Sequence, residues 1–162
     1  MGMVVLKRLE DAERDGDNIY AIVKGIGTSS DGKFKSIYAP RSGGQAKALR
    51  KAYADANIDR LSIGMLEAHG TGTAAGDAAE FDGLKEVFTE NIPENSGYPD
   101  FQHIALGSIK SQIGHTKAAA GIAGLIKTTL ALHHKILPPT INIERPSKKL
   151  GIEKTPFYLN TE

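Results

Sequence analysis

Two histidines lie where apolar, strand-like runs give way to glycine-rich turns. His69 directly follows the run 65–68, and His115 comes after the run 103–106 and a Gly/Ser turn. Because parallel strands present their carboxyl ends at one edge of a sheet, we expect both imidazoles to reach one cleft. Two neutral imidazoles can hold a carbonyl oxygen while negative charge develops on it. The competing interpretation is that each histidine is an ordinary packed and hydrogen-bonded residue.

Two charged residues, Lys110 and Glu80, are further candidates for such a site. Lys110 stands in the Gly/Ser turn before His115, where a lysine can orient an acid or tune a neighbouring histidine; the alternative is a plain surface lysine. Glu80 lies three residues after Asp77, an expected N-cap, and completes a capping-box pattern. His115 is expected to open a helix over 114–134, whose dipole disfavours the imidazolium and keeps the ring neutral.

The loop 70–73 offers backbone N–H groups together with the hydroxyls of Thr71 and Thr73. It can bind an anion or an amide-rich chain, or it can be a plain turn. Its glycines are misplaced for a dinucleotide-binding turn, and no Walker lysine follows. We expect no metal, because the five histidines include no pair at i,i+4 and the adjacent His133 and His134 point to different sides of a helix.

Strands that alternate with helices are predicted to position these residues. The expected strands cover 4–6, 19–26, 62–68, 103–107 and 156–160. The expected helices cover 45–56, 77–89 and 114–134, with one helical turn at 9–14. Irregular segments are expected at 28–44, 90–102 and 135–153. The alternation predicts an α/β fold with a mostly parallel sheet covered by helices.

The composition argues against several classes of protein. The chain has 162 residues, the size of one ordinary domain, and a net charge of +1, so nothing favours nucleic acid or an acidic membrane as a partner. It has no cysteine, which removes disulfides, thiolate metal sites and a cysteine nucleophile from this chain. No apolar run reaches membrane-spanning length, and the N-terminus does not resemble a signal peptide. We expect a cytoplasmic protein, with which the lack of cysteine is compatible.

Both ends of the chain are strand-like in sequence. Residues 1–6 begin at once as an apolar strand, and residues 157–162 end a strand-like run. Whole domains usually begin and end in polar, loose segments. We therefore expect that this sequence was cut from a longer protein.

The segments Glu67–Thr73 and Gly107–His115 resemble the two histidine motifs of β-ketoacyl-ACP synthases, a family that includes the ketosynthase domains of modular synthases. The order, spacing and flanking residues of the motifs agree with the family, and Lys135–Asn142 resembles the segment that follows them. In finer detail, 115–117 and 161–162 resemble the ketosynthase of the bacterial polyunsaturated fatty acid synthases. The resemblance covers nearly the whole chain.

This resemblance implies a thiolase-like fold, with layers α-β-α-β-α in the intact family, of which this chain forms mainly the C-terminal half. It implies that 1–162 is a single-domain fragment that starts after the nucleophile half and ends before the family's Gly-rich C-terminal segment. It implies a Cys-His-His site, in which the cysteine takes an acyl group from an acyl carrier protein. Malonyl-carrier protein then loses CO₂, and its enolate attacks the acyl thioester. His69 and His115 match the positions that stabilise the enolate oxygen.

The resemblance assigns roles to four more residues and to the partners. Lys110 would pair with Glu80 and hold the second histidine, and Thr71 and Thr73 would hydrogen-bond the phosphopantetheine arm. No cofactor is implied apart from the phosphopantetheine that carries the substrates. The implied partners are an acyl carrier protein with its malonyl and acyl thioesters, and we expect a homodimer.

Two hypotheses remain open. In the first, the chain is part of a condensing enzyme and, lacking a cysteine, forms no acyl-enzyme and performs no condensation by itself. In the second, it is a non-catalytic α/β module that associates with its own copies, because exposed strand edges favour association. A hydrolase or a nucleotide-binding domain is disfavoured, since the sequence has neither a G-x-S-x-G elbow nor a phosphate-binding fingerprint.

Overall fold

The centre of the fold is a parallel three-stranded sheet. The structure is a computed structural model and describes residues 1–33, 39–92, 102–144, 147–148 and 150–161. The strands are β1 (Met65–Glu67), β2 (Ile104–Gly107) and β3 (Phe157–Leu159), in the order β1-β2-β3. Both neighbouring pairs run parallel. The prediction of an α/β fold with a mostly parallel sheet is confirmed, with each of these strands shorter than expected.

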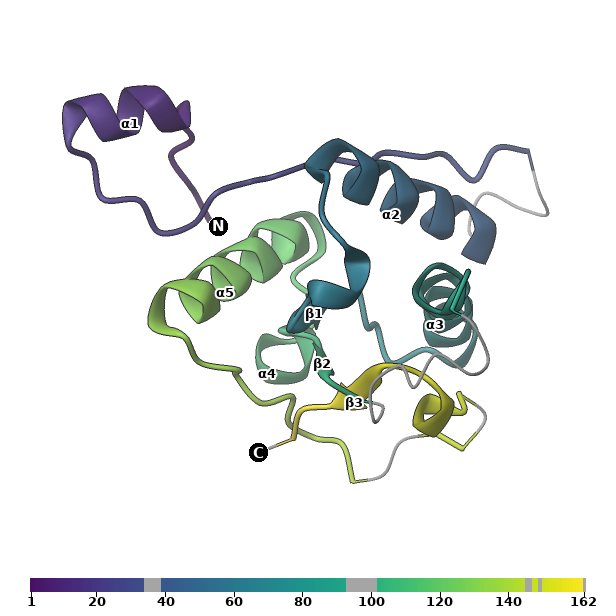
Figure 1. The fold of residues 1–162 in the computed structure, drawn as a ribbon. Coiled ribbons are helices and arrows are strands. Elements are labelled where there is room, and N and C mark those ends of the chain that lie inside the picture. Colours follow the sequence, from purple (N-terminus) through teal and green to yellow (C-terminus); the bar gives the residue numbers. More distant parts are fainter. Residues whose placement is uncertain (34–38, 93–101, 145–146, 149, 162) are drawn as a thin grey trace.

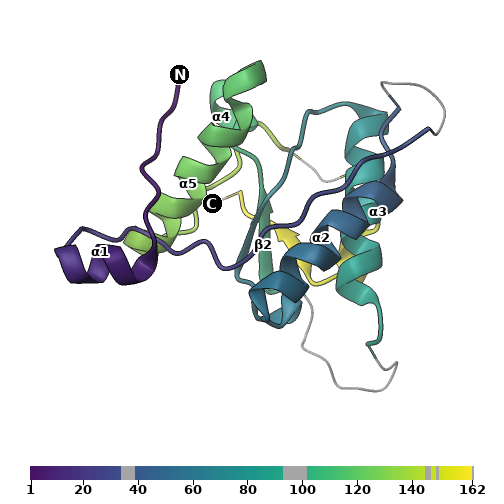
Figure 2. The same ribbon diagram turned by 90° about the horizontal axis from the view of Figure 1, so that it is seen from above.

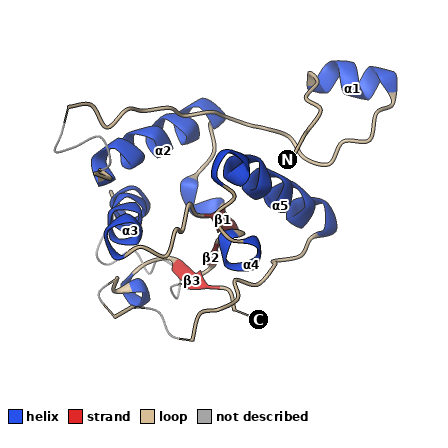
Figure 3. Cartoon of the chain, turned by 180° about the vertical axis from the view of Figure 1, so that it is seen from behind, coloured by secondary structure: helices blue, strands red, loops and turns tan. Residues whose placement is uncertain are grey.

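Helices lie on both sides of the sheet. Figures 1 and 2 show α2 (Ser42–Ala56) and α3 (Ala74–Thr89) on one side, and α4 (Lys110–Ile113) and α5 (Ala120–His134) on the other. Figure 3 shows the same arrangement from behind. The three 3₁₀-helices of the described chain are Arg60–Ser62, Lys117–Ala119 and Ile152–Lys154.

The main hydrophobic core fills the space between the sheet and the α2–α3 pair. Phe88, Ile104 and Phe157 are completely buried there, and the Phe88 and Phe157 rings lie 4.9 Å apart between centroids. Full burial of such a side chain stabilises the fold by about 1.5–3 kcal/mol. The core therefore fixes β2 and β3 against α3, and with them the edge of the sheet where β2 ends.

The N-terminal segment differs from the prediction. A helix, α1 (Leu9–Asp15), replaces the single turn expected at 9–14 and stands apart from the sheet (Figure 1). The strands expected at 4–6 and 19–26 are wrong, because both segments are irregular. A strand requires a neighbouring backbone to complete its hydrogen bonds, and these segments do not join the β1-β2-β3 sheet. The N–H of Ile26 instead donates to the Asp55 side chain on α2 at 2.9 Å.

The helix expected over 114–134 is also wrong in part. Residues 110–113 form the short α4, and Gly114 ends it with a φ of +71°. A 3₁₀-turn at 117–119 follows before α5 begins at Ala120. A positive φ interrupts a right-handed helix, and glycine adopts it without strain. His115 therefore lies in a loop and does not open a helix.

The predicted N-cap of α3 is displaced by four residues. The helix begins at Ala74, and its N-cap is Thr73, whose Oγ1 accepts the N–H of Gly76 at 3.3 Å. Asp77 lies inside the first turn and accepts the N–H of Gly72 at 3.2 Å. Glu80 consequently forms no capping box and is available for another role. The helix expected at 45–56 is confirmed as α2, which begins at Ser42.

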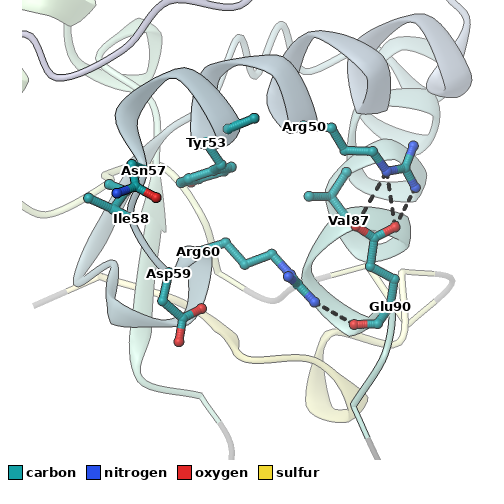
Figure 4. A pocket seen from close by; sticks show the side chains of 9 residues that line it. Arg50, Tyr53, Asn57, Ile58, Asp59, Arg60, Val87 and Glu90 are labelled. Atoms are coloured by element: carbon teal, nitrogen blue, oxygen red, sulfur yellow. Dashed lines mark hydrogen bonds and ion pairs between the residues drawn. The ribbon is translucent and has the colours of Figure 1, made fainter.

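A polar pocket lies between α2, the 3₁₀-turn 60–62 and the end of α3 (Figure 4). The guanidinium of Arg50 binds Glu90 at 2.6 Å and Glu86 at 2.9 Å, and the guanidinium of Arg60 donates to the carbonyl of Glu90. Glu90 and Glu86 raise the pKa of Arg50 above its usual value. Because residues 60–62 precede β1 in the chain, this pocket lies at the amino edge of the sheet, away from the histidines.

Parts of the three predicted irregular segments fall outside the described residues. These are 34–38, 93–101, 145–146 and 149, together with Glu162 at the end of the last predicted strand. None of the helices in the described part of the chain is both long and apolar enough to cross a membrane.

Candidate active site

His69 and His115 meet beyond the carboxyl ends of β1 and β2. Their ring centroids are 5.3 Å apart, and the ring planes stand at 89°. His69 lies two residues after the end of β1, and His115 lies two residues after α4, which follows β2. The expectation that the two imidazoles share one edge of the sheet is confirmed. Both residues are exposed, so the pair is open to a substrate.

The loop that carries His69 is held by Glu80. One carboxylate oxygen of Glu80 accepts the N–H of His69 at 2.6 Å, and the other accepts the N–H of Gly70 at 2.9 Å. Charge-assisted hydrogen bonds of this length are among the stronger ones in proteins. Each oxygen of Glu80 thus accepts a backbone amide, and among the described side chains Lys110 forms no ion pair with it. The pairing of Lys110 with Glu80 stays a prediction.

Gly70 lets the two histidine loops approach each other. Its φ is +44°, and a Cβ at this position would lie 2.8 Å from the Cβ of Ser108. Ser108 is itself buried and directly follows β2. Both the backbone conformation and the close contact therefore require glycine, which explains this element of the first motif in physical terms.

The environment of His115 favours a neutral ring with its proton on Nε2. The backbone N–H of Lys117 donates to Nδ1 of His115 at 3.1 Å, so Nδ1 carries no proton in this arrangement. The pKa of His115 is lowered from its usual 6.5. The largest cause is partial desolvation, and repulsion from Lys117, Lys110 and His69 adds to it. The neutral state was expected from a helix dipole, but desolvation and neighbouring cations are its causes. Nε2–H remains available as a donor.

Thr71 and Thr73 lie side by side in the exposed loop before α3. Their hydroxyl oxygens are 3.0 Å apart, and that of Thr73 also caps the helix. The loop thus presents two exposed residues with paired hydroxyls shortly after His69 in the chain. In the part of the chain that the structure describes, no group of three His, Asp or Glu side chains is arranged to hold a metal ion.

The second histidine loop is anchored by residues that sequence reasoning missed. Ser111 donates to the carbonyl of Ser108 at 2.9 Å, and its hydroxyl accepts the N–H of Ile141 at 3.2 Å. The Asn142 side chain donates to the carbonyl of Ser111 at 3.0 Å. Gln112 donates to the carbonyl of Pro139 at 2.8 Å. The resemblance of 135–142 to the family indicated that this segment matters. The periodicity of apolar residues gives no indication of such contacts.

A buried ion pair behind the histidines was also missed. Lys127 on α5 lies 2.7 Å from Glu67 on β1, with side chains 7% and 13% exposed. The available signal was compositional: each is a charged residue within an otherwise apolar run. A charge at such a position is expected to have a buried partner.

Comparison with known proteins identifies the chain's family. Residues 20–144 match the family model described as "Beta-ketoacyl synthase, C-terminal domain". The chain is 46% identical over 162 residues to a polyunsaturated fatty acid synthase of Thraustochytrium sp., covering 98% of this chain and 6% of that protein. It is 45% identical over 161 residues to polyketide synthase PksL of Bacillus subtilis, covering 99% of this chain and 3% of that protein. The chain therefore spans only a small part of these relatives.

Solved ketosynthases have the same fold. The ketosynthase from module 6 of the bacillaene synthase of Bacillus subtilis superposes with a TM-score of 0.88 at 44% identity, covering 96% of this chain and 27% of that one. The ishigamide ketosynthase/chain length factor gives a TM-score of 0.76 at 31% identity, covering 94% and 34%. The expected thiolase-like fold, of which this chain forms a C-terminal part, is confirmed. The chain belongs to the β-ketoacyl synthase family, in which residues 20–144 correspond to the C-terminal domain.

Proposed function

We propose that this chain supplies the two active-site histidines, His69 and His115, of a β-ketoacyl-ACP synthase. Such an enzyme joins a malonyl unit to an acyl thioester by decarboxylative Claisen condensation in fatty acid or polyketide synthesis. The observation that carries the proposal is the meeting of His69 and His115 at 5.3 Å, in an exposed site at the carboxyl edge of a parallel sheet. Membership of the β-ketoacyl synthase family supports the same reaction.

The histidines act on the malonyl thioester. The bond between its carboxylate and its α-carbon breaks, CO₂ leaves, and the electron pair forms an enolate whose oxygen bears the negative charge. The Nε2–H of His115, left free by the Nδ1 hydrogen bond, donates to that oxygen, and His69 donates from the second side. The enolate carbon then attacks the acyl thioester carbonyl, forming a carbon–carbon bond and expelling the thiolate.

Four residues support this chemistry. Glu80 fixes the backbone of His69, and Lys110 contributes positive charge that keeps the pKa of His115 low, after desolvation and Lys117. Thr71 and Thr73 present paired hydroxyls in the loop that follows His69. In the proposed complex these hydroxyls hydrogen-bond the amide-rich phosphopantetheine arm of an acyl carrier protein, so that no further cofactor is required.

The acyl-accepting nucleophile must come from outside these residues. The chain contains no cysteine, so it cannot hold the acyl group on a thiolate, and by itself it is inactive in condensation. In the proposed enzyme, a cysteine-bearing segment completes the site in a cytoplasmic homodimer that works with an acyl carrier protein.

A chimeric ketosynthase tests the proposal. The part of the Bacillus subtilis module 6 ketosynthase that matches this chain is replaced by these 162 residues, and the unaltered ketosynthase is the control. The chimera is expected to form an acyl-enzyme and to release the condensed thioester, both measured by mass spectrometry. Acyl-enzyme formation without condensation would contradict the role of the two histidines, and acyl transfer to the chain alone would contradict the need for an outside nucleophile.

A second candidate function is self-association without catalysis. Met3, Val5 and Leu6 are 85%, 95% and 76% exposed, and an apolar groove runs along α5 beside the N-terminal residues. Exposed apolar area of this kind marks interaction surfaces, and a second copy of the chain is the occupant this alternative requires. Sedimentation velocity across a range of concentrations is the test: dimers or larger assemblies are expected, and a monomer throughout would contradict this alternative.

A further inference from the structure

One carboxylate, that of Glu67, connects three elements behind the histidines. Its Oε2 binds the ammonium of Lys127 on α5 at 2.7 Å, in surroundings that leave the two side chains 7% and 13% exposed. The helix passes close by, since a Cβ on Gly124 would lie 3.1 Å from Cγ of Glu67. A buried ion pair that loses one partner leaves an uncompensated charge, so each residue constrains the other.

The second oxygen of Glu67 has a different partner. Oε1 accepts the backbone N–H of Ile109 at 2.6 Å. Ile109 is the N-cap of α4, and from it the chain continues through α4 and Gly114 to His115. The Lys127 ammonium holds one oxygen, and the other faces the start of α4. Charge-assisted hydrogen bonds of this kind are strong and geometrically selective.

Both ends of this connection lead to a histidine. Glu67 ends β1, two residues before His69, while Ile109 begins the segment that leads to His115. In the described chain, two side-chain hydrogen bonds join the histidine motifs Glu67–Thr73 and Gly107–His115. The bond from the N–H of Ile109 to Glu67 is short, at 2.6 Å. The other, from Ser108 to the carbonyl of His69, is 3.5 Å long and correspondingly weak.

We propose that Glu67, held in place by Lys127, is a positioning residue that sets the separation of His69 and His115. It acts through the backbone at Ile109 and not on the reacting atoms. The inference rests on the proposed function for its significance, since two donors must reach one enolate oxygen together. The separation of the two imidazole rings is a geometric quantity, however, and can be measured without substrate.

Paired variants of the 162-residue chain separate the hydrogen bond from the charge. E67Q/K127M removes both charges but keeps a side-chain oxygen that can accept the N–H of Ile109. E67M/K127M also removes both charges and has similar volume, but it has no acceptor. In the unaltered chain, nuclear Overhauser effects are expected between the carbon-bound ring protons of His69 and His115. We expect E67Q/K127M to retain this signal and E67M/K127M to lose it, while amide shifts of β2 and β3 stay in place.

The outcomes are distinct. Retention of the ring-to-ring signal in E67M/K127M would overturn the proposal, as would its loss in both variants with the sheet intact. If E67M/K127M does not fold, hydrogen exchange in the unaltered chain decides. The Ile109 amide should exchange at least about tenfold more slowly than in an unstructured peptide, and unprotected exchange overturns the proposal. Failure of the chimera to condense would overturn the proposed function but would leave this result unaffected.

Discussion

The backbone N–H of Lys117 donates to Nδ1 of His115 at 3.1 Å. This contact selects the tautomer with hydrogen on Nε2, the nitrogen that can then donate to a developing oxyanion. The 3₁₀-turn that contains Lys117 would be lost if the chain continued from α4 into α5 without a break. The interruption after Gly114 is therefore functional in this account, since it turns the His115 ring and fixes its protonation.

The first prediction concerns the pH dependence of His115. Its pKa in the folded chain is expected below 6.5, because partial desolvation, Lys117, Lys110 and His69 all disfavour the imidazolium. Replacing Lys110 by methionine should raise this pKa toward 6.5, whereas Lys47→Met on α2, across the sheet, should not change it. The measurement is an NMR titration of the His115 ring carbons. A pKa of His115 that does not respond to Lys110→Met would contradict this electrostatic role.

The same shift makes a prediction for stability. The folded pKa of His115 is lower than the unfolded one, so the unfolded chain binds the proton more readily. The stability linked to the neutral ring is therefore present above about pH 6.5 and is lost as the pH falls through the folded pKa. Urea denaturation of the chain and of His115→Asn should show a smaller loss in the variant over that interval, and parallel pH profiles would contradict the linkage.

A further prediction concerns the support of His69. Glu80→Gln leaves one oxygen for two N–H donors and places an NH₂ group against the second, so it should destabilise the chain by about 1–3 kcal/mol. Glu86→Gln on the same helix is the matched control. That residue forms an exposed ion pair with Arg50, and its loss should cost about 1 kcal/mol or less. Urea midpoints measure both variants, and equal effects would contradict a special role for Glu80.

The close approach of the two loops predicts a strong effect at Gly70. Gly70→Ala meets both an unfavourable positive φ and the side chain of Ser108, and it should destabilise the chain by about 2 kcal/mol or more. Gly121→Ala is the control, because that glycine is in α5 with open space around it and should stabilise by about 0.5–1 kcal/mol. Thermal melting distinguishes the two, and a neutral Gly70→Ala would show that the contact is not required.

The meeting of the two histidines could be predicted from the sequence, because each comes after an apolar run whose strand character is local. His69 and His115 follow β1 and β2, and parallel strands bring such positions to one edge. The break at Gly114 could not be predicted in the same way. An apolar, proline-free run favours a continuous helix, and composition does not record a positive φ.

The supporting contacts were the least predictable part of the site. Glu80 matched a capping box by spacing, but the helix begins at Ala74 and frees its carboxylate for the His69 loop. Alternating apolar residues at 19–26 predicted a strand, yet this segment forms none, because a strand also requires a neighbour to pair with. Local pattern specifies the elements, whereas these contacts depend on how elements distant in the sequence pack.

Malonyl decarboxylation by the chimeric ketosynthase tests the central claim most directly. His69→Ala and His115→Ala are compared with His134→Ala, a histidine at the far end of α5. Removal of one donor to a developing oxyanion should slow decarboxylation about 10²–10³-fold. Acyl-enzyme formation serves as the check that each variant is folded. The account predicts that both active-site variants lose decarboxylation while His134→Ala retains it. Decarboxylation at the unaltered rate in His69→Ala and His115→Ala, with acylation intact, would contradict it.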